Sequence, residues 1–160
     1  MPDNIYLGNP LLKKANTPIE FSEDQIIEFI KCKEDPVYFA QEYIKIVNVD
    51  RGLIPFEMYD FQTKLIDNFH KHRFNICKMP RQSGKSTTVV SYLLHYALFN
   101  DNSNIAILAN KASTARDLLG RLQTAYENLP KWLQQGVLAW NRGSLEIENG
   151  SKIVAASTSA

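Results

Sequence analysis

The chain has 160 residues, of which 44% are hydrophobic and 22% charged, with a formal net charge of +1 at neutral pH. This length suits one domain with its own core, and the near-neutral balance argues against binding nucleic acid through bulk positive charge alone. Cys32 and Cys77 form neither a disulfide framework nor a zinc pattern, and no apolar run is long enough to span a bilayer, so we expect a soluble intracellular protein.

The first half of the chain predicts an irregular segment followed by helices. Residues 1–20 contain three prolines and predict an irregular arm, so we place the folded domain at residues 21–160. Ser22 and Gln25 have the spacing of a capping box at the start of a helix. Asp35-Pro36 predicts the start of a second helix over residues 34–47. The buried side of the first helix is expected to consist of Ile26, Ile27, Phe29 and Ile30.

A third helix is predicted over residues 60–72, because its apolar residues recur at helical spacing. They form one face that consists of Phe61, Leu65, Ile66 and Phe69.

From residue 74 the pattern changes to alternating strands and helices. Residues 74–79 and 104–110 are short apolar strands, the second continuous in its centre, as is typical of a strand buried on both faces. Helices are predicted over 85–99 and 113–129. This order predicts an α/β fold with a parallel sheet flanked by helices. A C-terminal β-hairpin, with Asn149-Gly150 as its two-residue turn, follows at residues 144–158.

The stretch KMPRQSGKSTT, residues 78–88, joins the first strand to its helix. A standard phosphate-binding loop reads G-x-x-x-x-G-K-[ST], and this chain has Met79 where the first glycine belongs. The order strand, loop, helix still directs backbone N–H groups and the positive end of a helix toward a phosphate. We therefore predict a nucleotide site in which Lys85 reaches the β- and γ-phosphates, Ser86 binds Mg²⁺ and Gly84 admits the β-phosphate.

Neighbouring residues complete the predicted site. Thr87 is a candidate for the α-phosphate, and Gln82 and Ser83 add loop backbone around the phosphates. Arg81 carries a planar guanidinium that can bind phosphate oxygens with two hydrogen bonds; the alternative is a solvated loop residue. No acidic residue lies within residues 68–100, which makes the neighbourhood cationic.

The loop form R-Q-x-G-K-[ST]-T, without the first glycine, resembles that of the large terminase subunits of tailed bacteriophages. The segment FEMYDFQTKLI (residues 56–66) resembles the adenine-recognition segment of that family. Residues 107–136 and 140–160 resemble the stretches that follow the loop in the T-even type. The resemblance covers roughly residues 20–160. It implies a P-loop NTPase fold of the RecA or additional-strand type, with ATP and Mg²⁺ as ligands.

The resemblance also implies roles for single residues and for partners. Gln62 is expected to read the adenine edge, with Tyr59 or Phe61 as a stacking or packing surface, whereas without the resemblance Gln62 is an exposed helix residue. Arg81 is expected to stabilise, in cis, the negative charge on the γ-phosphate. The implied partners are double-stranded viral DNA, the portal protein and the small terminase subunit, in a ring motor on the procapsid in the host cytoplasm, away from any membrane.

The acidic residues that complete an ATPase site in this family are missing from the sequence. No apolar strand ends in adjacent acids, and Glu146 and Glu148 fall in the predicted hairpin. We expect the chain to be the N-terminal part of an ATPase domain, without the nuclease domain, that binds nucleotide weakly and hydrolyses it poorly or not at all. An incomplete sheet has an open apolar edge, so self-association is also expected.

Two other classes stay open. A superfamily 2 helicase lobe also carries a glutamine upstream of a GK[ST] loop, but such loops usually have small residues where this chain has Pro80-Arg81-Gln82. A non-catalytic nucleotide-binding or interaction module would keep the loop without turnover.

Overall fold

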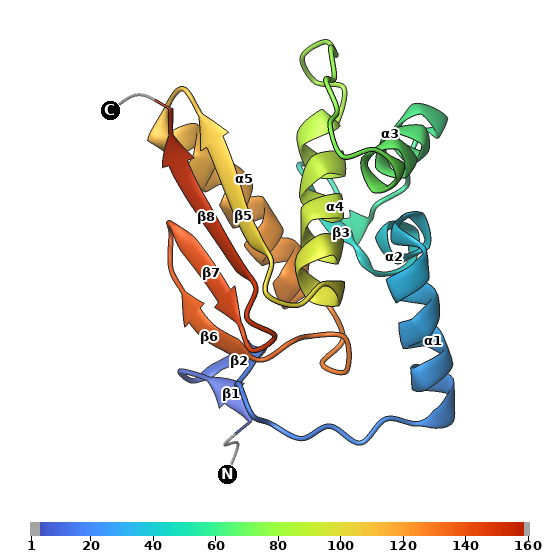
Figure 1. The fold of residues 1–160 in the computed structure, drawn as a ribbon, viewed down its shortest axis with the longest axis vertical. Helices are drawn as coiled ribbons and strands as arrows, with labels where there is room; N and C mark the ends of the chain where they lie inside the picture. The colour runs from blue at the N-terminus through green and yellow to red at the C-terminus, as the bar shows by residue number, and fades with distance from the viewer. Residues whose placement is uncertain (1–3, 159–160) are drawn as a thin grey trace.

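A computed structural model describes residues 4–158, which form five helices and eight strands (Figure 1). The helices are α1 (Glu23–Glu34), α2 (Pro36–Tyr43), α3 (Asp60–Lys71), α4 (Lys85–Phe99) and α5 (Ala112–Glu127). The strands are β1 (Ile5–Tyr6), β2 (Asn9–Lys13), β3 (Lys45–Asn48), β4 (Gly52–Pro55), β5 (Asn104–Ala109), β6 (Val137–Trp140), β7 (Ser144–Ile147) and β8 (Lys152–Ser157). None of the helices within the described residues is long and apolar enough to cross a membrane.

The main sheet has four strands in the order β5-β8-β7-β6 and is mixed. β5 and β8 are parallel, with Ile105 opposite Ile153, whereas β8 with β7 and β7 with β6 are antiparallel. The predicted C-terminal hairpin is confirmed as β7–β8, with Gly150 at φ +83° in its connection. The predicted two-residue turn is wrong, because the four residues 148–151 join the two strands. The expected parallel sheet is therefore correct only for β5 and β8.

The predicted strand over residues 74–79 is not formed, and this corrects the expected sheet. The segment is exposed between α3 and the loop, with Phe74 83% and Ile76 101% exposed. An apolar sequence becomes a strand only where a neighbouring strand accepts and donates its ladder hydrogen bonds, and none of the described strands pairs with this segment. β5 is consequently an edge strand, and Leu108 is 59% exposed instead of buried on both faces.

The expected irregular arm at residues 1–20 contains a β-hairpin within the described part, residues 4–158. β1 and β2 pair antiparallel, and Lys14 forms a parallel bridge to Val137 of β6. The hairpin therefore extends the β6 edge of the main sheet, at the bottom of Figure 1. The prolines in residues 1–20 argued against a strand in the sequence analysis. Pro10 lies in β2 all the same, because proline is compatible with an edge strand.

The predicted second helix ends at Tyr43, four residues early, because the chain enters a hairpin instead. β3 pairs antiparallel with β4, and Gly52 at φ +71° follows the turn. Ile46 and Val47 are β-branched, which favours a strand over a helical end.

The helix starts follow the sequence closely. The capping box at the start of α1 is confirmed, since Ser22 Oγ accepts the Gln25 N–H at 3.2 Å and Gln25 Oε1 accepts the Ser22 N–H at 3.1 Å. Asp35 caps α2 through two backbone N–H groups. The expected buried side of α1 is wrong, however: three of its isoleucines are 47%, 55% and 48% exposed, namely Ile26, Ile27 and Ile30.

α4 is the central helix of the molecule. It packs against α2 and α3 on one side and against α5 on the other, and α5 covers β5 and β8 (Figure 1). Its nearly continuous apolar sequence is explained by this position, with Leu94, Ala97 and Leu98 each at most 2% exposed. On α3 the expected apolar face is buried at Ile66, while Phe61 is 44% exposed. The packing fixes α4 firmly, and the loop at its N-terminus is positioned with it.

Candidate phosphate-binding site

The loop that precedes α4 is shaped by two residues with positive φ. Gly84 is the N-cap of α4, at φ +73° and ψ +10°, and Gln82 has φ +60°. The Gly84 carbonyl accepts both the N–H of Thr88 at 3.1 Å and its Oγ1–H at 3.0 Å. Because Thr88 is fully buried, this double contact fixes the last residue of the loop to the core of the molecule.

The loop leaves its backbone donors unused. From Gln82 to Thr87, no backbone N–H donates a hydrogen bond to another residue within 4–158. The first N–H groups of a helix have no partner inside the helix, and they carry the positive end of its dipole. Oxygen atoms of an anion are the acceptors that such an array is suited to bind.

Two side chains converge on one carbonyl at the start of the loop. Lys85 Nζ donates to the Pro80 oxygen at 3.1 Å, and Ser83 Oγ donates to the same oxygen at 2.9 Å. The ammonium group of Lys85 therefore lies across the loop instead of extending into solvent. An ammonium has three donors and no acceptor, so the remaining donors of Lys85 are available to an anion held by the loop.

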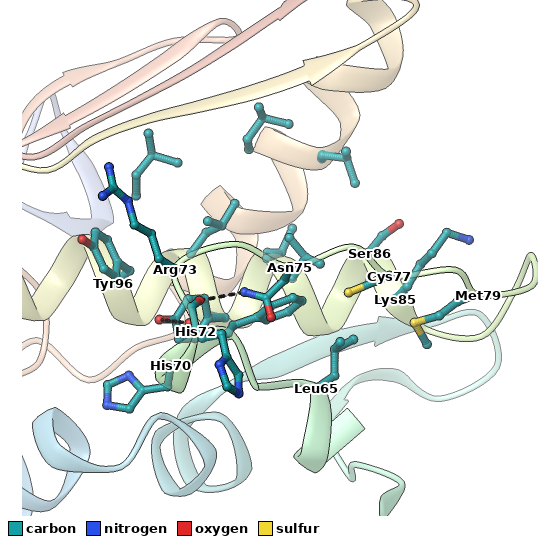
Figure 2. Close-up of a pocket in the computed structure, with 18 of the residues that line it drawn as sticks. Leu65, His70, His72, Arg73, Asn75, Cys77, Met79, Lys85, Ser86 and Tyr96 are labelled. Carbon is teal, nitrogen blue, oxygen red and sulfur yellow. Dashed lines mark hydrogen bonds between the residues drawn. The ribbon is translucent and has the colours of Figure 1, made fainter. Parts of the chain in front are cut away.

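Ser86 and Thr87 occupy different surroundings, although they are adjacent in α4. Ser86 lines the same cavity as Lys85, and its hydroxyl makes no hydrogen bond with the described residues (Figure 2). Thr87 lines a separate cavity of about 290 Å³ that it shares with Val90 and Arg121. The side chain expected at the α-phosphate is therefore apart from the Lys85–Ser86 pair, and only its backbone N–H belongs to the loop array.

The cavity beside Lys85 has a volume of about 920 Å³ and lies between residues 69–79, α4 and β5. Asn75, Cys77 and Met79 line it from the extended segment (Figure 2). Its charged lining is entirely basic and includes no Asp or Glu. Arg81 is exposed in the loop itself, and its side chain makes no hydrogen bond or ion pair with another described residue.

The start of α3 reaches the loop through Gln62. The side chain of Gln62 is only 3% exposed, so the alternative of an exposed helix residue is wrong. Its Oε1 accepts the Tyr59 N–H at 2.9 Å, and its Nε2 lies against Gly84. Tyr59 and Phe61 are exposed, and their rings are stacked with centroids 5.8 Å apart and planes 9° apart.

The sequence did not single out two parts of the site. Thr88 was treated only as helix, although a threonine one turn after a loop glycine can bond back to its carbonyl. The Pro80 carbonyl has no signal in the sequence, since its role depends on how the loop folds over it. Within residues 4–158 no group of three or more His, Cys, Asp and Glu side chains is close enough to hold a metal ion.

Comparison with known proteins gives the class of this domain. The sequence profile described as "Terminase large subunit, T4likevirus-type, N-terminal" matches residues 76–160, just over half of the chain. The crystal structure of the HK97 bacteriophage large terminase resembles the fold with a TM-score of 0.64, at 20% identity over 80% of this chain. This chain spans 28% of the length of that protein.

The fold is thus that of part of a large terminase. The profile match is more specific than the fold. It shows that the chain belongs to the family of T4-like terminase large subunits, and that it matches their N-terminal region.

Proposed function

We propose that this chain binds the phosphates of ATP at the loop before α4, as the nucleotide-binding part of a P-loop NTPase of the RecA or additional-strand type. The observation that carries the proposal is the row of unpaired N–H groups from Gln82 to Thr87, with the Lys85 ammonium across it. A phosphate would replace the Pro80 carbonyl as the acceptor of Lys85. The exposed pair Tyr59 and Phe61 offers the base an aromatic surface.

Mg²⁺ fits this site only in part. The unpartnered hydroxyl of Ser86 can contribute one oxygen ligand, with phosphate oxygens and water as the others. No carboxylate lines the adjoining cavity, so this chain supplies no acidic group there to orient a metal or activate a water. We expect nucleotide binding with little or no hydrolysis, which also describes a non-catalytic nucleotide-binding module.

In the wider assembly, the proposed role is that of the motor part of DNA packaging. Family membership supports translocation of double-stranded viral DNA into the procapsid in the host cytoplasm, with the portal protein and the small terminase subunit as partners in a ring. Arg81, exposed and without a side-chain hydrogen bond or ion pair among residues 4–158, is proposed to stabilise charge on the γ-phosphate in cis.

The first experiment is a titration of the purified chain with a fluorescent ATP analogue and Mg²⁺, with phosphate release followed in the same samples. Lys85→Ala is the test variant. Lys33→Ala is the matched control, because Lys33 is an exposed lysine on α1. We expect Lys85→Ala to weaken binding by about a hundredfold, since it removes a charged hydrogen bond to the phosphates, and Lys33→Ala to bind as the wild type does.

Equal binding by the wild type and Lys85→Ala would overturn the proposed site. Phosphate release that depends on Lys85 would leave the site in place but overturn the expectation of poor hydrolysis.

A further inference from the structure

We propose that Ser83 is a positioning residue of the loop before α4. Its hydroxyl closes the turn over residues 80–83, and this leaves the Ser83 backbone N–H free for a phosphate. The inference rests on the proposed function, because the phosphate is bound by the same loop. It assigns to a serine side chain the turn that a standard phosphate-binding loop makes with its first glycine, at the position where this chain has Met79.

The chain turns between Pro80 and Ser83 without that glycine. Pro80 has a fixed φ and no N–H, so its backbone offers only a carbonyl oxygen. Gln82, two residues later, has φ +60°, a left-handed conformation that glycine adopts more easily. Because this conformation is costly for a residue with a side chain, contacts at the ends of the turn are needed to hold it closed.

The hydrogen bond that closes the turn comes from a side chain. In a regular β-turn the carbonyl of the first residue accepts the backbone N–H of the fourth. Here the Pro80 carbonyl accepts the Ser83 Oγ–H at 2.9 Å, and the Ser83 N–H donates to no other residue within 4–158. The hydroxyl takes the place of the amide, as serine side chains can do in turns. The Ser83 N–H therefore stays in the row of free donors that runs from Gln82 to Thr87.

A second donor to the Pro80 carbonyl explains why this closure matters for binding. Lys85 Nζ donates to the same oxygen at 3.1 Å, so Lys85 and Ser83 together use both lone pairs of the carbonyl. When the ammonium moves to a phosphate, the hydroxyl remains the partner of the carbonyl and the turn keeps its shape. Without the hydroxyl, the regular donor for that carbonyl is the Ser83 N–H itself, and the ligand would lose this donor.

The first test needs no ligand. Exchange of the residue 83 amide proton with water is measured by NMR magnetisation transfer in the wild type, Ser83→Ala and Ser83→Thr. In Ser83→Ala the amide should close the turn in place of the hydroxyl, and its exchange should slow by about fivefold, the effect of one hydrogen bond. Ser83→Thr keeps a hydroxyl and should exchange as the wild type does. Loss of a merely structural bond would loosen the loop instead, so equal or faster exchange in Ser83→Ala would overturn the inference.

The second test measures affinity for the fluorescent ATP analogue and, by competition, for inorganic tripolyphosphate, both with Mg²⁺. Ser83→Ala should weaken both ligands by a similar factor, about fivefold, because the turn now uses one of the phosphate donors. Ser83→Thr should bind both ligands as the wild type does.

Ser103→Ala is the matched control for this affinity measurement. The Ser103 Oγ–H also donates to the carbonyl three residues earlier, that of Asn100, at 2.9 Å. Ser103 lies between α4 and β5, and its N–H already donates to Ser151 Oγ at 3.1 Å. We expect the control to lose the same kind of hydrogen bond without any change in affinity for either ligand.

Slower exchange with unchanged affinity in Ser83→Ala would show that the hydroxyl closes the turn, but it would overturn the role of Ser83 in phosphate binding. If the wild type binds neither ligand in a Lys85-dependent manner, the proposed function fails, and the exchange measurement still decides how the turn is closed. Thermal unfolding of each variant identifies any that has lost its fold.

Discussion

Two polar regions at opposite ends of the molecule differ in how far their hydrogen bonds are satisfied. The hairpin junction (Lys13, Asn16, Gln134, Gly136 and Glu148) joins the N-terminal hairpin to the main sheet. Its carboxylate accepts backbone N–H groups at 2.8 Å and 2.7 Å and the lysine ammonium at 3.3 Å. The loop before α4 (residues 80–88) instead leaves a row of backbone donors without a partner among residues 4–158.

On the proposed function, this difference distinguishes polar groups that stabilise the fold from polar groups that bind a ligand. A buried polar group that finds all its partners inside the protein contributes to stability and has nothing left to offer a ligand. The exposed donors of the loop cost little while water solvates them, and they are free for an anion. The junction should therefore respond to substitution in the free energy of unfolding, and the loop in ligand affinity.

The largest effect is expected from Glu148→Ala in the hairpin junction. This change removes the acceptor of the Asn16 and Gly136 N–H groups and leaves Lys13, 8% exposed, with an uncompensated charge. We expect a loss of about 3 to 4 kcal/mol in the free energy of unfolding, measured by urea denaturation, with nucleotide affinity unchanged. Glu146→Ala is the control, since no hydrogen bond or ion pair involves the Glu146 side chain within the described region.

The same carboxylate gives the junction an acid dependence. Burial would raise the pKa of Glu148, but hydrogen bonds from Gly136 and Asn16 and the charge of Lys13 outweigh it and hold the pKa below its ordinary value of 4.5. A carboxylate with a lowered pKa stabilises the folded state above the unfolded pKa, and this contribution disappears as pH falls through the folded value. If Glu148→Ala is as stable as the wild type at neutral pH, the hairpin junction does not contribute to stability, and the proposed difference between the two regions is wrong.

His95, on the same helix as the loop but buried at its far side, predicts a second pH effect. The Cys32 carbonyl accepts the Nε2–H at 2.8 Å, and Nδ1 has no partner among residues 4–158. Burial, only partly opposed by the Cys32 carbonyl, lowers the pKa of His95 from 6.5 to about 4. Its ring is surrounded by Phe39, Tyr92 and Phe99, with His70 nearby.

Between pH 4 and pH 6.5, His95 binds a proton in the unfolded chain but not in the folded chain. The free energy of unfolding should therefore fall as pH decreases from 6.5 to 4, by up to about 3 kcal/mol. Urea denaturation at several pH values measures this fall. His95→Gln should flatten it, whereas His72→Gln, a change at an exposed position, should not. A fall of equal size in His95→Gln would assign the effect to other groups.

Gly84→Ala is expected to give the next effect, and it acts on the loop. The left-handed backbone at φ +73° costs an alanine about 1 to 2 kcal/mol, and the new Cβ would be 2.5 Å from Gln62 Nε2. We expect loss of measurable binding of the fluorescent ATP analogue together with this modest loss of stability. The matched control is Gly120→Ala in α5, where no atom lies within 4 Å of the new Cβ. There we expect a gain of about 0.5 to 1 kcal/mol. Normal affinity in Gly84→Ala would mean that the loop does not need this conformation.

Helix positions were predictable from the sequence because their signals are local. Ser22 with Gln25 and Asp35 with Pro36 mark helix starts through contacts within four residues, and the structure confirms both. The sequence also predicted a loop directly before the helix that starts at Lys85, and the structure confirms this position. The contact of Gln62 with Gly84 was not predicted, since nothing local indicates that positions 22 residues apart come into contact.

Sheet membership was less predictable, because a strand depends on distant partners. Residues 74–79 and the N-terminal hairpin were misjudged in opposite directions, the first as a strand and the second as irregular. Apolar residues raised the expectation of a strand for the first segment, and prolines lowered it for the second, whereas the observed pairing depends on which strand edge is available. The exposed isoleucines of α1 have the same cause, because helical spacing predicts an apolar side but not what covers it.

The smallest effect is expected from a substitution at Ile76. It tests whether residues 74–79 form the strand that the sequence predicts or the exposed segment that the structure shows. Ile76 is fully exposed at 101%, whereas Ile153 of β8 is 1% exposed. Ile76→Ser should change the free energy of unfolding by less than about 0.5 kcal/mol. It should also reduce self-association measured by sedimentation velocity, since it removes exposed apolar surface. Ile153→Ala, in contrast, should cost about 2 to 4 kcal/mol. If Ile76→Ser costs as much as Ile153→Ala, the segment is packed in solution, and the strand predicted from its sequence forms there after all.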